Sequence, residues 1–327
     1  MRLLFCYLRT HGDIIRTFPM LDAIKEIYSD TYIGYTCYED MVETCNLCSS
    51  VDEIFIQPRI LPVINNVGGT RLLNCSVMEE SINRIREAKF DIYVDLQGVF
   101  QSALIGCLAN IQCRVGRDRK TTKDDAYLFY SKIQPVTSCN KMERHFDMCK
   151  SIFPTIMPSC SDMEWTKHTV ISIFPGSSIL GVLKRWSIIK YNELRNMVGE
   201  KYSAKLILGP DEYDLINYIP EDAHKDVITI KTWNDAKRII EKSRIVIGND
   251  IAYLHMAIWK RIPTIMICGP TSHAINGVWR YSDGKNIISH QACKTKCDVW
   301  KGKCDNRHMC LDEISVDEVY STVRKYM

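Results

Sequence analysis

The sequence contains Ile245-Val-Ile-Gly-Asn-Asp250-Ile-Ala-Tyr-Leu-His255-Met-Ala257, and shortly after it Pro263-Thr-Ile-Met-Ile-Cys-Gly-Pro-Thr271. The β-branched run that opens the first stretch predicts a buried strand, and the polar turn after it predicts a helix capped by Asp250. A second buried strand then ends at Gly-Pro-Thr. A helix N-terminus between two parallel strands offers unpaired N–H groups and a positive dipole to an anion. The pattern therefore predicts a seat for a diphosphate. An ordinary βαβ unit with a capped helix also explains it, and that alternative stays open here.

The composition excludes several classes of protein. The chain has 327 residues, of which 46% are hydrophobic and 25% charged, as in a globular protein long enough for two domains. The net charge of +3 is too small to indicate nucleic-acid binding. No apolar run is long enough for a signal peptide or a membrane span. We expect a cytoplasmic protein, and contact with the cytoplasmic face of the inner membrane is compatible with this.

Strand and helix patterns alternate in both halves of the chain. This alternation predicts two doubly wound α/β domains, which we expect to face a central cleft. The expected bounds are 1–156 for the N-terminal domain, 157–168 for a linker and 169–327 for the C-terminal domain. Helices are expected at Asp13–Tyr28 and Ser315–Tyr326, and the latter is a candidate to pack back on the N-terminal domain. We expect a loop at Pro58–Asn74 and a basic turn at Arg114–Lys120.

A Gly-Asp pair follows the first predicted strand, in Thr10-His-Gly-Asp13. Gly12 permits close approach of the backbone to a ligand. Asp13 is placed where ligands bind in this class of fold, and a carboxylate there can accept a proton from an attacking hydroxyl. Alternatively, Asp13 only caps the helix, and its position alone does not decide between these roles.

The first strand of the second half runs into Phe174-Pro-Gly-Ser-Ser178, and Lys184-Arg-Trp186 follows. Small residues, two hydroxyls and a lysine after a strand are typical of an anion-binding loop. Lys184 could neutralise charge on a departing diphosphate. The alternative is a surface loop with a solvated Lys-Arg pair.

These motifs together resemble glycosyltransferase family 9, the bacterial ADP-heptose:lipopolysaccharide heptosyltransferases, which have the GT-B fold. The resemblance rests on Gly12-Asp13 with Thr17 and Pro19, on Asp95-Leu-Gln-Gly98, and on Arg114-Val-Gly116 with Asp118-Arg-Lys120. It continues through Pro175-Gly-Ser177, Lys184-Arg-Trp186, Gly248-Asn-Asp250, His255 and Gly269-Pro-Thr271, and ends at Cys304 with His308-x-Cys310-Leu311.

The resemblance implies an inverting transfer of heptose from ADP-heptose to a lipopolysaccharide core acceptor, without a catalytic metal or other cofactor. Asp13 would be the general base and Lys184 would hold the donor diphosphate. The implied donor-binding residues are Gly12, Ser177, Ser178, Asn249, Asp250, Ala252, His255 and Thr271. The implied acceptor-binding residues are the basic Arg114, Arg117, Arg119 and Lys120. The family commonly has glycine where this chain has Ala252, which leaves the sugar nucleotide open.

Four cysteines, Cys293, Cys297, Cys304 and Cys310, lie within 18 residues. Thiolates at such spacings are typical of a tetrahedral zinc or iron site, although they match no zinc ribbon. The sequence thus predicts a structural metal site, with reduced thiols or a disulfide as the alternative.

Three other functions stay open. A protein O-heptosyltransferase of the same fold would differ only in its acceptor. A GT-B sugar-nucleotide 2-epimerase would need more acid and base residues than we find. A non-catalytic nucleotide-binding module would have no need for both Asp13 and Lys184.

Overall fold

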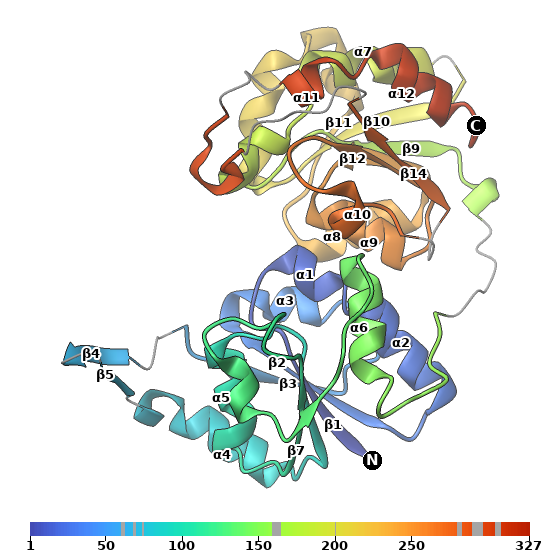
Figure 1. The fold of residues 1–327 in the computed structure, drawn as a ribbon. Helices are drawn as coiled ribbons and strands as arrows, with labels where there is room; N and C mark the ends of the chain where they lie inside the picture. Colours follow the sequence, from blue (N-terminus) through green and yellow to red (C-terminus); the bar gives the residue numbers. More distant parts are fainter. Residues whose placement is uncertain are drawn as a thin grey trace. The chain divides into compact units, whose positions relative to one another are not determined.

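The computed structural model divides the chain into two compact units, Met1–Ser159 and Cys160–Met327. It describes residues 1–59, 63–67, 70–73, 75–158, 165–199, 201–279, 283–289, 297–304 and 309–327. Each unit has a six-stranded parallel sheet between two layers of helices (Figure 1). Of the expected linker, residues 165–167 form a short 3-10 helix and residues 159–164 lie outside the described part.

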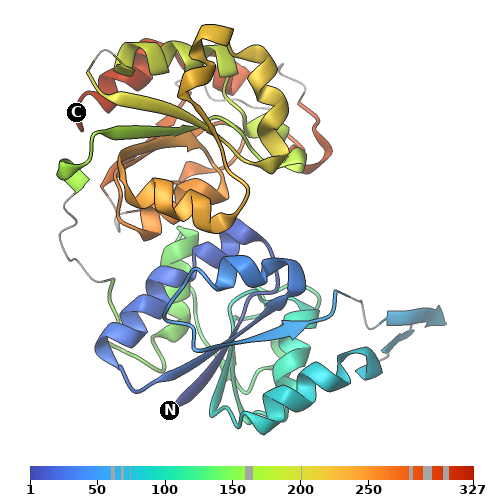
Figure 2. The same cartoon turned by 180° about the vertical axis from the view of Figure 1, so that it is seen from behind.

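The strands of the first unit lie in the order β3-β2-β1-β6-β7-β8. They are β1 (Arg2–Cys6), β2 (Tyr32–Tyr38), β3 (Glu53–Gln57), β6 (Ile92–Asp95), β7 (Cys113–Gly116) and β8 (Lys132–Ile133). The helices are α1 (His11–Ile15), α2 (Phe18–Ile27), α3 (Val42–Cys45), α4 (Glu79–Glu87), α5 (Phe100–Leu108) and α6 (Lys141–Cys149). Both views place α2 and α6 on one face of the sheet and α4 and α5 on the other (Figures 1 and 2).

The second unit repeats this topology, with the order β11-β10-β9-β12-β13-β14. Its strands are β9 (Val170–Phe174), β10 (Ser203–Leu208), β11 (Val227–Thr229), β12 (Ser243–Asn249), β13 (Thr264–Cys268) and β14 (Gly284–Ile288). Its helices are α7 (Ile188–Gly199), α8 (Trp233–Glu241), α9 (Ala252–Trp259), α10 (His273–Asn276), α11 (Met309–Asp312) and α12 (Val316–Val323). The prediction of two doubly wound α/β units is confirmed.

The last helix forms as its sequence predicts, since the Ser315 hydroxyl accepts a hydrogen bond from the Glu318 N–H. Its buried residues Val316, Val319 and Val323 join the hydrophobic core of the second unit, together with residues of α7. Its packing on the first unit stays a prediction.

The single helix expected at Asp13–Tyr28 is wrong, because the chain forms α1 and α2 with a break at Arg16 and Thr17. Proline has no N–H to donate, and its ring clashes with the carbonyl four residues earlier. Pro19 therefore stands in the first turn of α2.

The loop expected at Pro58–Asn74 is also wrong in part. There β4 (Val63–Val67) and β5 (Thr70–Leu73) pair as antiparallel strands. The expected basic turn begins as a strand, because residues 114–116 belong to β7. Among the described residues, no helix combines the length and apolar character that crossing a membrane requires.

Candidate active site

In each unit, polar side chains follow the two central strands. The strand order reverses between β1 and β6 in the first unit and between β9 and β12 in the second. Doubly wound sheets bind ligands outside the carboxyl ends of the strands at such a reversal. Asp13 lies in α1 directly after β1, and Asp250 follows β12. The topology thus provides one candidate site in each unit.

The Asp13 carboxylate is held by two cations in the first unit. Its Oδ1 atom lies 2.5 Å from the Arg16 guanidinium and 3.1 Å from Lys141 Nζ. Its Oδ2 atom accepts a long hydrogen bond, 3.4 Å, from the Thr10 hydroxyl. Burial acts to raise the pKa of this carboxyl, but Arg16 and Lys141 outweigh burial and hold the pKa at about 2. Asp13 is therefore ionised at neutral pH.

Two rings and a third cation surround this carboxylate. Tyr7 and His145 pack edge to face, with ring centroids 5.9 Å apart. Burial, followed by the charge of Arg117, lowers the pKa of His145 to about 3, so its imidazole is neutral. Burial raises the pKa of the Tyr7 hydroxyl, and the charge of Asp13 adds to this effect. The first site is therefore positively charged by Arg16, Lys141 and Arg117.

The four basic residues predicted to bind the acceptor take different positions. The Arg117 guanidinium donates to the Gln97 carbonyl, and its buried Nε has no hydrogen-bond partner within the described part of the chain. Arg114 donates at 2.7 Å to the carbonyls of both Phe129 and Ile111, so it holds the backbone together. Arg119 lies over the ring of Tyr127, and Lys120 is exposed. Of the four, Arg117 contributes to the charge around Asp13.

Asp95 organises the loop below Arg117. Its buried carboxylate accepts hydrogen bonds from the N–H groups of Gln97 and Gly98 and from the hydroxyls of Ser102 and Tyr130, at 2.7 to 2.9 Å. Gly98 has a positive φ of 71°, and a Cβ there would lie 2.6 Å from the Arg117 guanidinium. The Asp-x-x-Gly motif therefore shapes the loop on which Arg117 rests.

In the second unit, Asn249 is a buried structural residue. Its side-chain oxygen accepts from the Trp186 N–H and the Tyr191 hydroxyl, both at 2.9 Å. Its amide nitrogen donates to the carbonyls of Pro175 and Gly176, at 2.8 and 3.0 Å. These contacts use the full hydrogen-bonding capacity of the amide. Asn249 therefore fixes the loop after β9, and its side-chain amide has no hydrogen bond left to offer to a sugar nucleotide.

Asp250 links Lys184 to the start of α9. Its carboxylate accepts a 3.0 Å hydrogen bond from His255 Nε2 and lies 3.6 Å from Lys184 Nζ. Lys184 also donates to the Asp250 carbonyl at 3.3 Å. The helix cap expected at Asp250 is wrong, because α9 begins at Ala252 with Ile251 as its N-cap. The Asp250 carboxylate binds His255 and Lys184 instead.

The loop after β9 packs against a buried glutamate. Gly176 leaves no room for a side chain, since a Cβ there would lie 2.0 Å from the Glu212 carboxyl carbon. Glu212 accepts a hydrogen bond from the Gly209 N–H at 2.8 Å. Burial raises the pKa of the Glu212 carboxyl to about 7, against the opposing effects of Gly209 and Arg185. Arg185 also donates to the hydroxyl of the buried Ser177 at 3.0 Å.

The remaining residues that were predicted to bind the sugar-nucleotide donor lie at accessible positions. Ser178 is exposed, and Ala252 and Thr271 are partly exposed after β12 and β13, respectively. Gly12 is partly exposed in α1 of the first unit, next to Asp13.

A sequence profile of glycosyltransferase family 9 (heptosyltransferase) matches residues 79–305. The chain belongs to glycosyltransferase family 9. It is 20% identical to lipopolysaccharide heptosyltransferase 3 of Escherichia coli in an alignment of 344 positions, gaps included. The alignment covers 98% of this chain and 97% of that protein.

Two solved structures share the fold. E. coli ADP-heptose lipopolysaccharide heptosyltransferase II superimposes with a TM-score of 0.74 at 15% identity, covering 100% of this chain and 98% of that one. The iron-containing dodecameric glycosyltransferase TibC from enterotoxigenic E. coli H10407 gives a TM-score of 0.54 at 12% identity, covering 99% and 75% of the two chains. The predicted family and its GT-B fold class are confirmed, and the protein is a glycosyltransferase.

Two residues of this family 9 enzyme escaped the sequence analysis. Lys141 carries no signal in the sequence, because lysines are common on any protein surface. Glu212 follows β10, the strand beside β9, so its place at the carboxyl edge of the sheet was open to prediction.

The cysteine set is only partly visible. Cys297 and Cys304 have their sulfurs 3.6 Å apart, and the bridge between Asp298 and Lys303 closes the loop between them. Cys310 is buried in α11, whereas Cys293 lies outside the described residues. Within the described part, no group of three or more candidate metal ligands is present.

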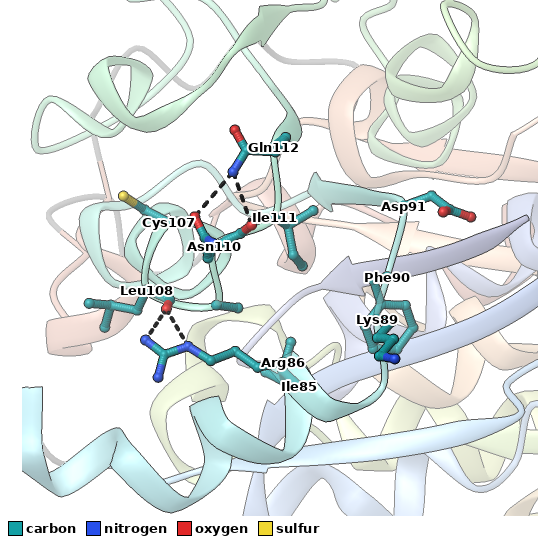
Figure 3. Close-up of a pocket in the computed structure, with 11 residues that line it drawn as sticks. Ile85, Arg86, Lys89, Phe90, Asp91, Cys107, Leu108, Asn110, Ile111 and Gln112 are labelled. Atoms are coloured by element: carbon teal, nitrogen blue, oxygen red, sulfur yellow. Dashed lines mark hydrogen bonds between the residues drawn. The ribbon is translucent and has the colours of Figure 1, made fainter.

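A pocket of about 720 Å³ lies at the opposite edge of the first sheet, before β6 and β7 (Figure 3). Two of its polar side chains bond to its own backbone: Arg86 donates to the Leu108 carbonyl and Gln112 to the Asn110 carbonyl. The pocket is remote from Asp13, at the edge of the sheet where doubly wound folds do not bind substrates. We therefore assign the chemistry of this family 9 enzyme elsewhere.

Proposed function

We propose that this enzyme transfers a heptose from ADP-heptose to a lipopolysaccharide core acceptor, with inversion at the anomeric carbon. Family membership and the full-length similarity to a lipopolysaccharide heptosyltransferase support the choice of substrates. The observation that carries the proposal is the contact between Lys184 and Asp250 beside the first turn of α9. It provides a cation and a helix N-terminus at the edge where these sheets bind ligands.

The donor site acts on the leaving group. As the bond between sugar and diphosphate breaks, negative charge grows on the diphosphate oxygen. The Lys184 ammonium and the N–H groups at the start of α9 stabilise that charge. We propose that these groups suffice for transfer without a metal ion. Asn249 keeps the loop after β9 in place during the reaction.

The acceptor site acts on the nucleophile. Asp13 takes the proton from the attacking hydroxyl, which makes the oxygen a better nucleophile. The partly exposed Arg117 guanidinium attracts an anionic group of the acceptor, such as a phosphate, and Arg119 and Lys120 extend this positive surface. We leave Arg114 out of this proposed site, because its Nε and one terminal nitrogen donate to backbone carbonyls. Since the proposed acceptor is a lipid, we place the reaction at the cytoplasmic face of the inner membrane, with peripheral contact.

A sugar-transfer assay with the purified enzyme tests the proposed function. ADP-heptose is mixed with heptose-deficient lipopolysaccharide, and both ADP release and the mass of the lipopolysaccharide are measured, with UDP- and GDP-sugars as donor controls. We expect ADP release and one added heptose only with ADP-heptose. Heptose on a protein acceptor would replace the proposed acceptor, epimerised sugar nucleotide would indicate a 2-epimerase, and binding of ADP-heptose without turnover would indicate a binding module.

We also propose a structural zinc or iron site at Cys297 and Cys304, with Cys293 and Cys310 as further ligands. Two thiolates on one tetrahedral zinc, at about 2.3 Å each, lie about 3.8 Å apart. The observed sulfur separation of 3.6 Å fits this geometry. TibC, which shares the fold, is described as iron-containing.

Elemental analysis of reduced protein, purified without an affinity metal, tests the metal site. One zinc or iron per chain that is lost in a Cys297→Ser, Cys304→Ser double variant is expected. A metal content far below one per chain in the parent protein would refute the site.

A further inference from the structure

The two oxygens of the Asp13 carboxylate have different surroundings. Arg16 and Lys141 both contact Oδ1, at 2.5 and 3.1 Å. Oδ2 accepts only the long bond from the Thr10 hydroxyl, at 3.4 Å, among the described residues. A fifth of the Asp13 side chain is exposed, so a ligand can reach it. The carboxylate is therefore fixed through one oxygen and available through the other.

We propose that Lys141 is a positioning residue that, together with Arg16, holds Oδ1 of Asp13 so that Oδ2 is the oxygen that takes the acceptor proton. This inference rests on the proposed function. In the step, the acceptor O–H bond breaks and its proton moves to Oδ2. The acceptor oxygen forms the bond to the anomeric carbon, and the bond from that carbon to the diphosphate breaks, with its electron pair leaving on the diphosphate.

The position of Lys141 in its own helix supports this role. Lys141 is the first residue of α6, where the helix dipole is positive and a cation is unfavourable. The Asn140 side chain already caps the helix by accepting from the Met142 N–H at 3.0 Å. Lys141 is therefore not needed to cap α6, and its side chain donates to Asp13, 128 residues earlier.

Neither neighbouring cation makes Lys141 redundant. Arg16 lies three residues after Asp13, so this ion pair is local to α1. Lys141 joins the carboxylate to α6, on which His145 lies one turn later. His145 is neutral and cannot supply the missing charge, and Arg117 makes no hydrogen bond or ion pair with Asp13 among the described residues. Tyr7, the remaining titratable neighbour, is uncharged because its pKa is raised.

Substitution of Lys141 gives a test with two readouts. The variants are Lys141→Gln, the conservative Lys141→Arg, and a control, Lys150→Gln. Lys150 lies at the other end of α6, where it forms an ion pair with Asp147. The pKa of Asp13 is measured by carboxyl NMR on ¹³C-aspartate protein and assigned by the signal lost in Asp13→Asn. Steady-state kinetics give kcat and KM for both substrates.

For Lys141→Gln we expect the Asp13 pKa to rise from about 2 toward its ordinary value of 3.8. We expect kcat to fall about tenfold with the donor KM unchanged, because a base that is less well placed acts in the chemical step. Lys141→Arg should restore both values and Lys150→Gln should change neither. An unchanged Asp13 pKa or an unchanged kcat in Lys141→Gln would overturn the inference. A parent enzyme that transfers no heptose would refute the proposed function, and the titration would still decide whether Lys141 holds Asp13.

Discussion

Replacing Asp13 by asparagine tests the core of the proposed mechanism. Asparagine keeps the size of the side chain and can still accept from Thr10, but it is uncharged and is no base. Arg16 and Lys141 then lose the anion between them. The substitution should therefore affect both turnover and stability, and the structure sets the size of each effect.

A positioned general base contributes roughly 10²–10⁴-fold to a rate, and most when its pKa is near the working pH. Because the Asp13 pKa is about 2, we expect a loss near the lower end, about a hundredfold in kcat. The pKa falls from its ordinary value of 3.8 to about 2 in the folded protein, which corresponds to about 2 kcal/mol. A lowered carboxyl pKa stabilises the fold above pH 3.8, and this contribution is lost as the pH falls through 2. At pH 7 the variant should lose about 2 kcal/mol, or roughly 4–8 °C in melting temperature.

The assays are ADP release, calorimetric binding of ADP and thermal unfolding at pH 7. Asp226→Asn is the matched control, because Asp226 also lies between two cations, Arg195 at 2.5 Å and Lys205 at 2.7 Å. Asp226 stands before β11, at the amino edge of the second sheet, so its loss should reduce stability without lowering kcat. Both variants should bind ADP as the parent does. If Asp13→Asn transfers sugar at the parent rate, Asp13 only supports the fold and the general-base assignment is wrong.

Three further outcomes follow from the second unit. Glu212→Gln should raise the free energy of unfolding relative to the parent by about 3 kcal/mol at pH 8 but not at pH 4. Because burial raises the Glu212 pKa from 4.5 to about 7, the folded parent protein loses stability as the pH rises through 7, whereas the glutamine variant does not. Equal differences at the two pH values, in denaturant titrations, would contradict this. Gly176→Ala should weaken ADP binding and lower the free energy of unfolding by about 1–3 kcal/mol, because the new Cβ meets Glu212. In the control Gly199→Ala the new Cβ meets no atom within 4 Å, so stability should not change. Equal melting temperatures of the two variants would argue against the close contact. Asn249→Ala should lower the free energy of unfolding by about 3 kcal/mol and weaken ADP binding, because it leaves buried polar groups unpaired. An unchanged ADP affinity in calorimetry would refute the role of Asn249 in shaping the loop.

Sequence patterns predicted the fold where burial dominates. The interior strands are apolar runs buried on both faces, such as Thr264–Cys268, and such runs are visible without a structure. The errors had local causes. Pro19 signalled a break that we placed at the entry of one helix, although it separates two. The antiparallel pairing of β4 and β5 was predictable in principle, because the sequence has Gly68-Gly69 between two short strand-like runs.

The candidate site was predictable only in part. Residues after the central strands, such as Asp13, Lys184 and Asp250, follow from topology, because doubly wound sheets place them at the ligand-binding edge. The role of Asn249 did not follow. It stands beside Asp250 in sequence, but its amide points into the core and bonds to Trp186 and Pro175. Both side chains are buried, yet Asp250 contacts Lys184 whereas the Asn249 amide holds the loop after β9, and the sequence does not show which residue takes which part.

Charge in the two sites explains why the missed partners matter. A general base and a phosphate-binding lysine are both recognised by residue type, yet their chemistry depends on the groups that contact them. Asp13 alone would be an ordinary carboxylate, and it is Arg16 and Lys141 that leave one oxygen to act. Lys184 would likewise be an ordinary surface cation, and it is Asp250, itself fixed by His255, that holds it beside α9. In both units the residue that we propose to carry the chemistry is held by an ion pair, so the partner residues are the more sensitive positions at which to test the mechanism.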